Sequence, residues 1–301
     1  MEGARGPAEA RGLEVARGAG YLVATTALWG SSFVFITASV RSEDPFSYAF
    51  YRALIGLLAL SPIALAGLRG RQSPARDFAN GLKLGTAYAL GLVLQGMGAA
   101  TVSPALNAYL TAFSVVLVHI YEWAFSRRYS AGMLASLASS MAGLAIFFGL
   151  PGEDSDPLGM ALVLAGSFAW AAEIIMASSY GTNPTWTTMG LLAATLAISA
   201  PPYLALAGPR APSPTFLAQV SYLALACTLA ATYLQLVGQR VIGPATASLI
   251  YLLEPVFATA FSVAIYGEGM DLRKALGGSL MVAASYLAVR QEATASAGGE
   301  R

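Results

Sequence analysis

The chain has 301 residues, of which 56% are hydrophobic and only 11% are charged, and its formal net charge at pH 7 is +1. Soluble domains carry about 25% charged residues, so this composition excludes an ordinary soluble protein and indicates an integral membrane protein. The near-neutral charge, without a basic patch, also argues against nucleic acid as a partner, because phosphates select strongly basic surfaces. The single cysteine, Cys227, can form no internal disulfide.

Runs of about twenty apolar residues, each long enough to cross a bilayer as a helix, follow one another along most of the chain. Residues 1–19 mix Arg and Glu with Ala and Gly, and we expect them and residues 291–301 to be solvated tails. The connections between runs are too short to hold a soluble domain. The sequence therefore predicts an all-α integral membrane protein with ten transmembrane helices, at roughly 20–40, 46–68, 80–100, 104–125, 131–150, 158–179, 185–207, 216–238, 244–266 and 273–290.

The Lys and Arg residues between these helices and at their ends predict the orientation, because such residues stay on the cytoplasmic side. With the N-terminus inside, twelve of them are cytoplasmic and four are external. We therefore expect a multi-pass protein of the cytoplasmic (inner) membrane with both termini in the cytoplasm. Nothing in the sequence requires a second subunit, so a monomer is compatible with it.

The two halves of the chain resemble each other. At an offset of 140, Gln95 pairs with Gln235, and Ser103-Pro104-Ala105 pairs with Gly243-Pro244-Ala245; at 141, Ala27-Leu28-Trp29 pairs with Phe168-Ala169-Trp170. Each copy holds five helices, and an odd number makes the second copy enter the membrane from the opposite side. The sequence thus predicts two inverted five-helix repeats, 20–150 and 157–290, around a central cavity, the plan of many secondary transporters.

Glu254-Pro255 lies near the middle of the ninth predicted helix. A carboxylate there costs about 2.5 to 3.5 kcal/mol and normally faces a bundle interior or a watery cavity. Pro255 removes a backbone donor and can bend the helix, which leaves a carbonyl free for a ligand or water. The alternative is a structural acid that stays neutral and hydrogen-bonded between helices.

Trp29 and Trp170 each lie one helical turn before a polar residue, Ser32 and Glu173 respectively. The two matching faces predict two walls of one chamber, one of them acidic. Alternatively, the tryptophans are packing residues. Arg52 lies about six residues inside the second helix, where it either snorkels to the surface or anchors a carboxylate.

The fourth predicted helix carries a polar seam that lines an aqueous path or joins helices by hydrogen bonds. The lone His119 falls far short of a metal site, so we expect none; packing is the preferred role and proton handling the alternative. We find no ATP-binding loop, no paired catalytic constellation and no potassium-channel filter, and predict neither enzyme activity nor a cofactor. The seam comprises Ser103, Asn107, Thr111, Ser114, Tyr121 and Glu122.

Four stretches resemble the drug/metabolite transporter superfamily, and within it the ten-helix exporters of the EamA type. They are Ala-Leu-Trp-Gly-Ser-Ser-Phe-Val-Phe-Ile from Ala27, Phe-Tyr-Arg-Ala-Leu-Ile from Phe50, Ser-Pro-Ala-Leu-Asn-Ala-Tyr-Leu-Thr from Ser103, and Leu-Glu-Pro-Val-Phe-Ala-Thr-Ala-Phe-Ser from Leu253 with an exit Glu268. The chain departs from the family pattern at Ser114-Val115, at Arg128 and at Ser32. The resemblance covers about residues 20–290.

The resemblance implies peripheral fifth and tenth helices, a central cavity and export of small metabolites. YddG-like exporters of aromatic amino acids would suit a chamber that includes Tyr109 and mixes aromatic walls with a few charges, in which Arg52 or backbone donors hold a carboxylate and Glu173 or Glu254 an ammonium. Alternatives are a nucleotide-sugar or drug transporter, a lipid-modifying enzyme or a passive pore. The predicted substrate-binding residues are Trp29, Ser32, Tyr51, Arg52, Tyr88, Asn107, Thr111, Trp170, Glu173, Tyr251 and Glu254.

Overall fold

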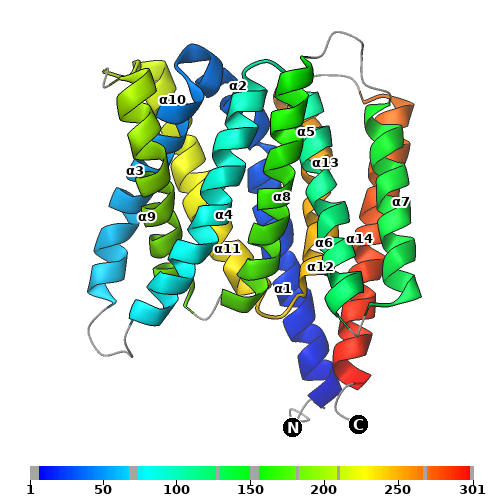
Figure 1. Cartoon of the computed structure of the whole chain (residues 1–301). Helices are drawn as coiled ribbons and strands as arrows, with labels where there is room; N and C mark the ends of the chain where they lie inside the picture. The colour runs from blue at the N-terminus through cyan, green and yellow to red at the C-terminus, as the bar shows by residue number, and fades with distance from the viewer. Residues whose placement is uncertain are drawn as a thin grey trace.

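The computed structural model describes residues 7–67, 74–126, 129–149, 156–180, 183–208, 211–266 and 270–298; Arg128 and Glu268 lie outside them. All regular secondary structure in these ranges is helical, and each of the ten predicted ranges falls on helix (Figure 1). The elements are α1 (Pro7–Gly30), α2 (Ser32–Ser42), α3 (Pro45–Ala66), α4 (Ala75–Ala99), α5 (Pro104–Thr111), α6 (Phe113–Phe125), α7 (Ala131–Phe148), α8 (Pro157–Tyr180), α9 (Pro184–Pro202), the π-helical η1 (Tyr203–Ala207), α10 (Pro214–Tyr222), the π-helical η2 (Leu223–Ala230), α11 (Ala231–Gly238), α12 (Pro244–Tyr251), α13 (Glu254–Tyr266) and α14 (Leu272–Gly298).

Eight helical segments among the described residues are long and apolar enough to cross a membrane. They confirm a multi-pass membrane protein. α4 and α14 are not among the eight, and both carry charged residues within their bounds, including Lys83 and Arg290. The count of ten transmembrane helices therefore stays a prediction.

Prolines and short polar residues set where the helices begin. α3, α5, α9, α10 and α12 each start at a proline, whose missing N–H is not needed in the first turn. Asp44 caps α3 by accepting hydrogen bonds from two backbone N–H groups. Asp156 does the same for α8 at Leu158 and Gly159, and hydrogen bonds from the Thr101 side chain and from these N–H groups lower the pKa of Asp156.

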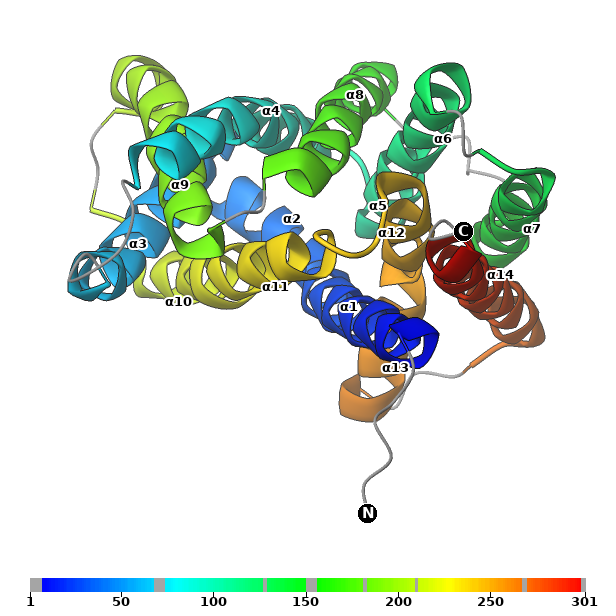
Figure 2. The same cartoon turned by 90° about the horizontal axis from the view of Figure 1, so that it is seen from below.

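Seen along the bundle axis, the helices form two rows (Figure 2). One row holds α9, α4, α8 and α6; the other holds α3, the α10–η2–α11 rod and α1. α7 and α14 pair with each other at one end of the bundle, as the family resemblance implies for the fifth and tenth helices. α1 begins and α14 ends at the same end of the bundle, whereas α8, which begins the second half, starts at the opposite end, in agreement with inverted repeats (Figure 1).

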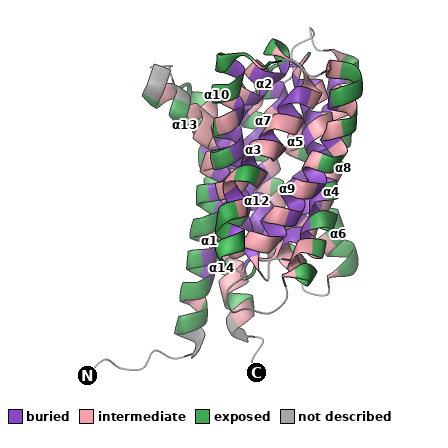
Figure 3. Cartoon of the chain, turned by 90° about the vertical axis from the view of Figure 1, so that its left-hand side faces the viewer, coloured by how far each residue is buried: buried purple, intermediate pink, exposed green. Residues whose placement is uncertain are grey.

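Buried residues fill the interior of the bundle, and exposed residues lie on its outer faces (Figure 3). Trp123, Phe125 and Leu272 are each more than 70% exposed, as expected of side chains that meet lipid. Small residues let the helices approach closely: a Cβ on Gly277 of α14 would lie 2.5 Å from the carbonyl oxygen of Gly143 of α7.

The first and last helices extend into the two segments expected to be solvated tails. α1 already begins at Pro7, and Val15, which is 1% exposed, belongs to a buried cluster against which Val289 and Ala293 of α14 pack. α14 continues to Gly298. Each of the two segments is too polar in sequence to predict packing, but the few apolar side chains of both bury a small apolar surface between α1 and α14.

Three helices break near the middle of the bundle. α1 and α2 meet at Ser31, whose hydroxyl donates to the Leu28 carbonyl at 2.6 Å. α12 ends just before Pro255, as the missing proline N–H predicts. The matching position of the first repeat, Ala112, also interrupts its helix, although no proline follows. There the Thr111 hydroxyl bonds back to the Asn107 carbonyl at 2.8 Å, a contact that bends helices.

Candidate functional site

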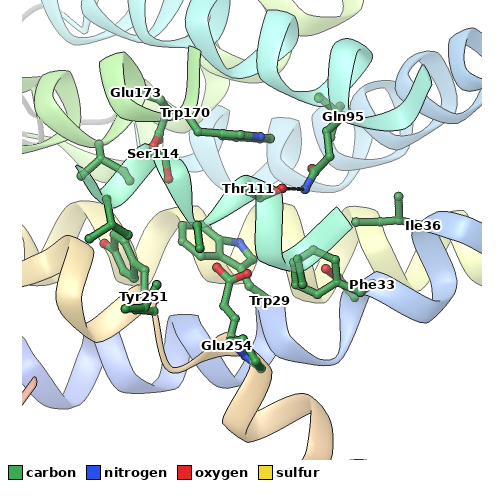
Figure 4. Close-up of a pocket in the computed structure, with 18 of the residues that line it drawn as sticks. Trp29, Phe33, Ile36, Gln95, Thr111, Ser114, Trp170, Glu173, Tyr251 and Glu254 are labelled. Carbon is green, nitrogen blue, oxygen red and sulfur yellow. Dashed lines mark hydrogen bonds between the residues drawn. The ribbon is translucent and has the colours of Figure 1, made fainter. Parts of the chain in front are cut away.

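The broken helices surround one pocket (Figure 4). It contains about 760 Å³ of space not filled by atoms, including its opening to solvent. Ser32, Ala112 and Leu252, each at or beside a helix break, contribute to its wall. The full lining is Trp29, Ser32, Phe33, Ile36, Arg52, Tyr88, Leu92, Gln95, Ala108, Thr111, Ala112, Ser114, Val115, Trp170, Glu173, Ile174, Tyr251, Leu252, Glu254 and Pro255.

Aromatic side chains form two walls. Trp29 of α1 meets Tyr251 edge-on, with ring centroids 5.0 Å apart, and its indole N–H donates to the Cys227 carbonyl at 3.0 Å. Trp170 of α8 meets Tyr88 of α4 with centroids 5.2 Å apart, and its indole nitrogen is buried without a hydrogen-bond partner. Fixed rings of this kind can stack on a flat ligand.

Arg52 contributes a cation that no carboxylate neutralises. Its side chain is 4% exposed, and it donates to the hydroxyls of Tyr48 and Thr228 and to the Cys227 carbonyl. All three acceptors are neutral, and no carboxylate oxygen among the described residues lies within 4.0 Å of it. A guanidinium has five N–H donors, so two of them are left for a ligand. Arg52 therefore points inward and does not snorkel.

The π-helical segment η2 helps to hold this cation. Widening a helix into a π-turn shifts backbone carbonyls out of their regular pairing, and such turns often occur at functional sites. In η2 the carbonyl of Cys227 accepts from both Trp29 and Arg52, while the neighbouring Thr228 hydroxyl also meets Tyr88 at 3.1 Å. Hydrogen bonds to Cys227 and Thr228 thus connect α1, α3 and α4 to η2.

The two pocket carboxyls differ in their surroundings. Glu254 starts α13 and points into the cavity beside Trp29, without a hydrogen-bond partner among the described residues (Figure 4). Glu173 is 1% exposed; one of its oxygens accepts from Gln235 of α11 at 3.0 Å, and the other is buried without a partner. The carboxyl group of Glu254 is therefore open to a ligand, whereas that of Glu173 is enclosed by protein.

Nine of the eleven predicted site residues line the pocket, and two do not. Tyr51 lies elsewhere, its hydroxyl 3.2 Å from that of Tyr203. Asn107 is fully buried beneath the break between α5 and α6, where its side-chain oxygen meets the Thr111 hydroxyl. Tyr109 packs against Phe148 and does not line the pocket.

Gln95 and Ser114 line the pocket but were not among the predicted site residues. Gln95 donates to the Thr111 hydroxyl at 3.0 Å. The match of Gln95 to Gln235 in the second repeat is the feature of the sequence that could have indicated it as a site residue. Ser114 belongs to the polar seam of the fourth predicted helix. Of that seam only Thr111 and Ser114, on either side of the break at Ala112, line the pocket.

His119 lies away from the pocket, with its Nδ1 2.7 Å from the Tyr129 hydroxyl. Within the described residues, no group of three or more His, Cys, Asp and Glu side chains is arranged to hold a metal ion.

A family model described as the EamA-like transporter family matches residues 16–149 and again residues 157–290. An uncharacterized transporter of Archaeoglobus fulgidus is 29% identical over 248 residues, covering 80% of this chain and 75% of the relative. The uncharacterized inner membrane transporter YedA of Escherichia coli strain K12 is 28% identical over 269 residues, covering 84% of each chain.

A solved crystal structure of another protein has the same fold. Its TM-score is 0.73 at 19% sequence identity, covering 89% of this chain and 97% of that one. The two family matches coincide with the two halves of the bundle, so the internal duplication expected from paired residues such as Gln95 and Gln235 has an independent counterpart.

Proposed function

Because the chain belongs to the EamA-like transporter family, we propose that it is a secondary transporter that exports small metabolites, and specifically neutral and aromatic amino acids, across the cytoplasmic membrane. The inner-membrane description of YedA supports this location. Two inverted repeats, 20–150 and 157–290, rock against each other about the pocket, with both termini in the cytoplasm.

One observation carries the choice of substrate: the pocket contains an unneutralised cation and a free carboxylate, with aromatic walls beside them. Arg52 offers two N–H groups to a carboxylate, which a guanidinium binds strongly through paired hydrogen bonds. Glu254 offers its oxygens to an ammonium. An amino acid supplies both charges, and the ligand carboxylate completes the missing ion pair of Arg52.

The tryptophans argue for a flat or apolar side chain. Trp29 and Trp170 line the same pocket, and each meets a tyrosine ring in an edge-on contact, Tyr251 and Tyr88 respectively. A bound aromatic ring would gain about 0.5 to 1.5 kcal/mol from an edge or offset contact beyond its burial.

The test is counterflow with the purified protein in liposomes loaded with unlabelled phenylalanine, with labelled phenylalanine outside. We expect saturable exchange that unlabelled phenylalanine inhibits, but that phenethylamine, which lacks the carboxylate, and phenylpropionate, which lacks the ammonium, inhibit at least tenfold less well. Equal inhibition by phenethylamine would indicate a cationic drug carrier, and inhibition only by a nucleotide sugar would indicate that substrate class.

A matched pair of variants connects the result to the pocket. Glu254→Gln keeps the size of the side chain and removes its charge, so we expect it to lose the discrimination against phenylpropionate. Glu122→Gln, which makes the same change on α6 outside the pocket, is expected to exchange phenylalanine like the unmodified protein.

A further inference from the structure

Glu173 of α8 and Gln235 of α11 meet in the bundle interior. The amide nitrogen of Gln235 donates to one carboxyl oxygen of Glu173 at 3.0 Å. The other oxygen of Glu173 and the side-chain oxygen of Gln235 are both buried without a hydrogen-bond partner. Glu173 is 1% exposed and Gln235 is fully buried. Two oxygens without a donor at one contact are costly in a bilayer interior.

A single proton on Glu173 would satisfy both of these unpaired oxygens. A protonated carboxyl group has one O–H donor, and a carboxylic acid and a primary amide pair through two hydrogen bonds, N–H to the acid and O–H to the amide oxygen. An ionised Glu173 would instead have a single neutral donor and no cation. The described residues place no Lys, Arg or His nitrogen within 4.0 Å of it.

The titratable groups facing Glu173 do not supply a counter-charge. They are Tyr88 on α4, Tyr251 on α12, Glu254 on α13 and, across the pocket, Arg52 on α3. The Tyr251 hydroxyl donates a hydrogen bond to the Gln239 side chain at 3.1 Å, and the Tyr88 hydroxyl is hydrogen-bonded to that of Thr228. Arg52 donates to the hydroxyls of Tyr48 and Thr228 and to the Cys227 carbonyl. On α6, His119 is turned to Tyr129.

The acid and the amide belong to different packed groups of helices. α8 packs chiefly against α4, whereas α11 packs chiefly against α1. The two helices occupy different rows of the bundle (Figure 2). Both helices belong to the second repeat, so the rocking of the two repeats must be accompanied by a movement of α8 away from α11 within that repeat. This movement would separate Glu173 from Gln235 and admit water to the carboxyl.

We propose that Glu173 and Gln235 form a proton-binding site in which the carboxyl is protonated and occluded in this conformation, and that separation of α8 from α11 releases the proton. In that step the O–H bond of Glu173 breaks, the proton passes to water and the carboxylate keeps the electron pair. Glu254 faces the substrate, whereas Glu173 carries the proton that couples transport to a proton gradient. The coupling step rests on the proposed carrier function; proton occupancy does not.

Proton occupancy is tested by infrared spectroscopy of the purified protein in lipid at neutral pH, without substrate. We expect a deuterium-sensitive carbonyl band of a protonated carboxylic acid that Glu173→Gln removes. Glu14→Gln, which alters an exposed acid paired with Arg11, should leave the band unchanged. A Glu173→Gln spectrum that retains the whole band overturns the proposal.

The swap variant Glu173→Gln with Gln235→Glu protects the test against misfolding, because it keeps one acid and one amide at the same contact. We expect it to restore the band that Glu173→Gln removes, and to fold even if the single variant does not. A folded swap protein without this band also overturns the proposal.

Coupling is tested with labelled phenylalanine in the same liposomes. We expect Glu173→Gln to retain measurable counterflow, since exchange needs no net proton movement, whereas its accumulation under an imposed pH gradient should fall to the level without a gradient. Gradient-driven accumulation that persists, or counterflow lost in a folded variant, excludes the coupling role. Absence of counterflow in the unmodified protein would instead refute the proposed substrate and leave the infrared result valid.

Discussion

Arg52 is a charge that the fold holds at a cost. Burying a guanidinium without an anion carries a large desolvation free energy, and hydrogen bonds to neutral acceptors offset only part of it. Such residues inside membrane helices usually serve function more than stability. The cost is understandable if a substrate carboxylate arrives to form the missing ion pair.

Arg52→Gln should therefore separate stability from transport. Charged hydrogen bonds contribute about 1.5 to 3 kcal/mol, so we expect phenylalanine exchange to fall roughly ten- to a hundredfold. The melting temperature should stay equal or rise, because the uncompensated charge is gone. Counterflow and thermal unfolding in detergent measure the two effects.

Arg290→Gln is the control, since Arg290 is exposed on α14, outside the pocket lining, and its guanidinium hydrogen-bonds to Tyr286. It should alter neither quantity. A large drop in the melting temperature of Arg52→Gln with normal exchange would show that Arg52 is a structural clamp between α3 and η2.

The ionisable residues of the pocket are divided unequally between the two repeats. At an offset of 140 Ser114 corresponds to Glu254, and at 141 Ser32 corresponds to Glu173. All four line the pocket. The second repeat thus supplies both acids, and the first supplies serines at the same places together with Arg52. The sequence alone predicted the chemical types at the site, but which acid is sealed depends on Gln235, a contact across 62 positions.

At the scale of the elements, the helix breaks put backbone and side chains from three helices around one space. The break at Leu252 followed from Pro255, a local cause that is visible in the sequence. The break at Ala112 did not, because it depends on how Thr111 bonds to Asn107 and Gln95 once the bundle has formed. A proline in the sequence thus predicts the break at Leu252 but not the matching break at Ala112.

Two of the breaks touch each other. A Cβ placed on Gly30, at the end of α1, would lie 2.7 Å from the Glu254 carbonyl oxygen and 2.9 Å from the Phe257 Cβ. Gly30 thus lets α1 pass directly beside the start of α13. The position of Glu254 in the pocket depends on this approach.

Gly30→Ala should push α13 away from α1 and displace Glu254. We expect at least a tenfold loss of phenylalanine exchange and a lower melting temperature, because overpacking typically costs about 1 to 3 kcal/mol. Gly20→Ala makes the same change on the same helix where a Cβ meets nothing within 4 Å, and it should have no such effect. Equal behaviour of the two variants in counterflow and unfolding would rule out the α1–α13 contact as the cause.

At the scale of the whole molecule, the repeat is what the sequence revealed best. Shared Gln, Pro and Trp positions placed the two halves in register, and the halves coincide with two matches of one family model. Tyr51 shows the limit of this reasoning. It shares a helix with Arg52, but the neighbouring residue on a helix points about 100° away, and here it meets Tyr203 instead of the pocket.

The inverted arrangement requires the two ends of α14 to lie on opposite sides of the membrane, and orientation by positive charge puts the C-terminal end inside. Met270 comes just before α14 and Thr294 is near the end of this helix, and both residues are exposed. The two ends of α14 lie at opposite ends of the bundle (Figure 1). In a Cys227→Ser background, a membrane-impermeant maleimide should label Met270→Cys in intact cells and Thr294→Cys only after the membrane is opened.

The opposite pattern would reverse the orientation while keeping the fold in the membrane. Labelling of both positions from the same side would mean that α14 does not cross, which would end the ten-helix plan. Because α14 carries more polar residues than the eight clearly apolar segments, this is the helix on which the count depends most. Its pairing with α7 through Gly143 and Gly277 leads us to expect that it crosses, since such close contact places the two helices at the same depth over much of their length.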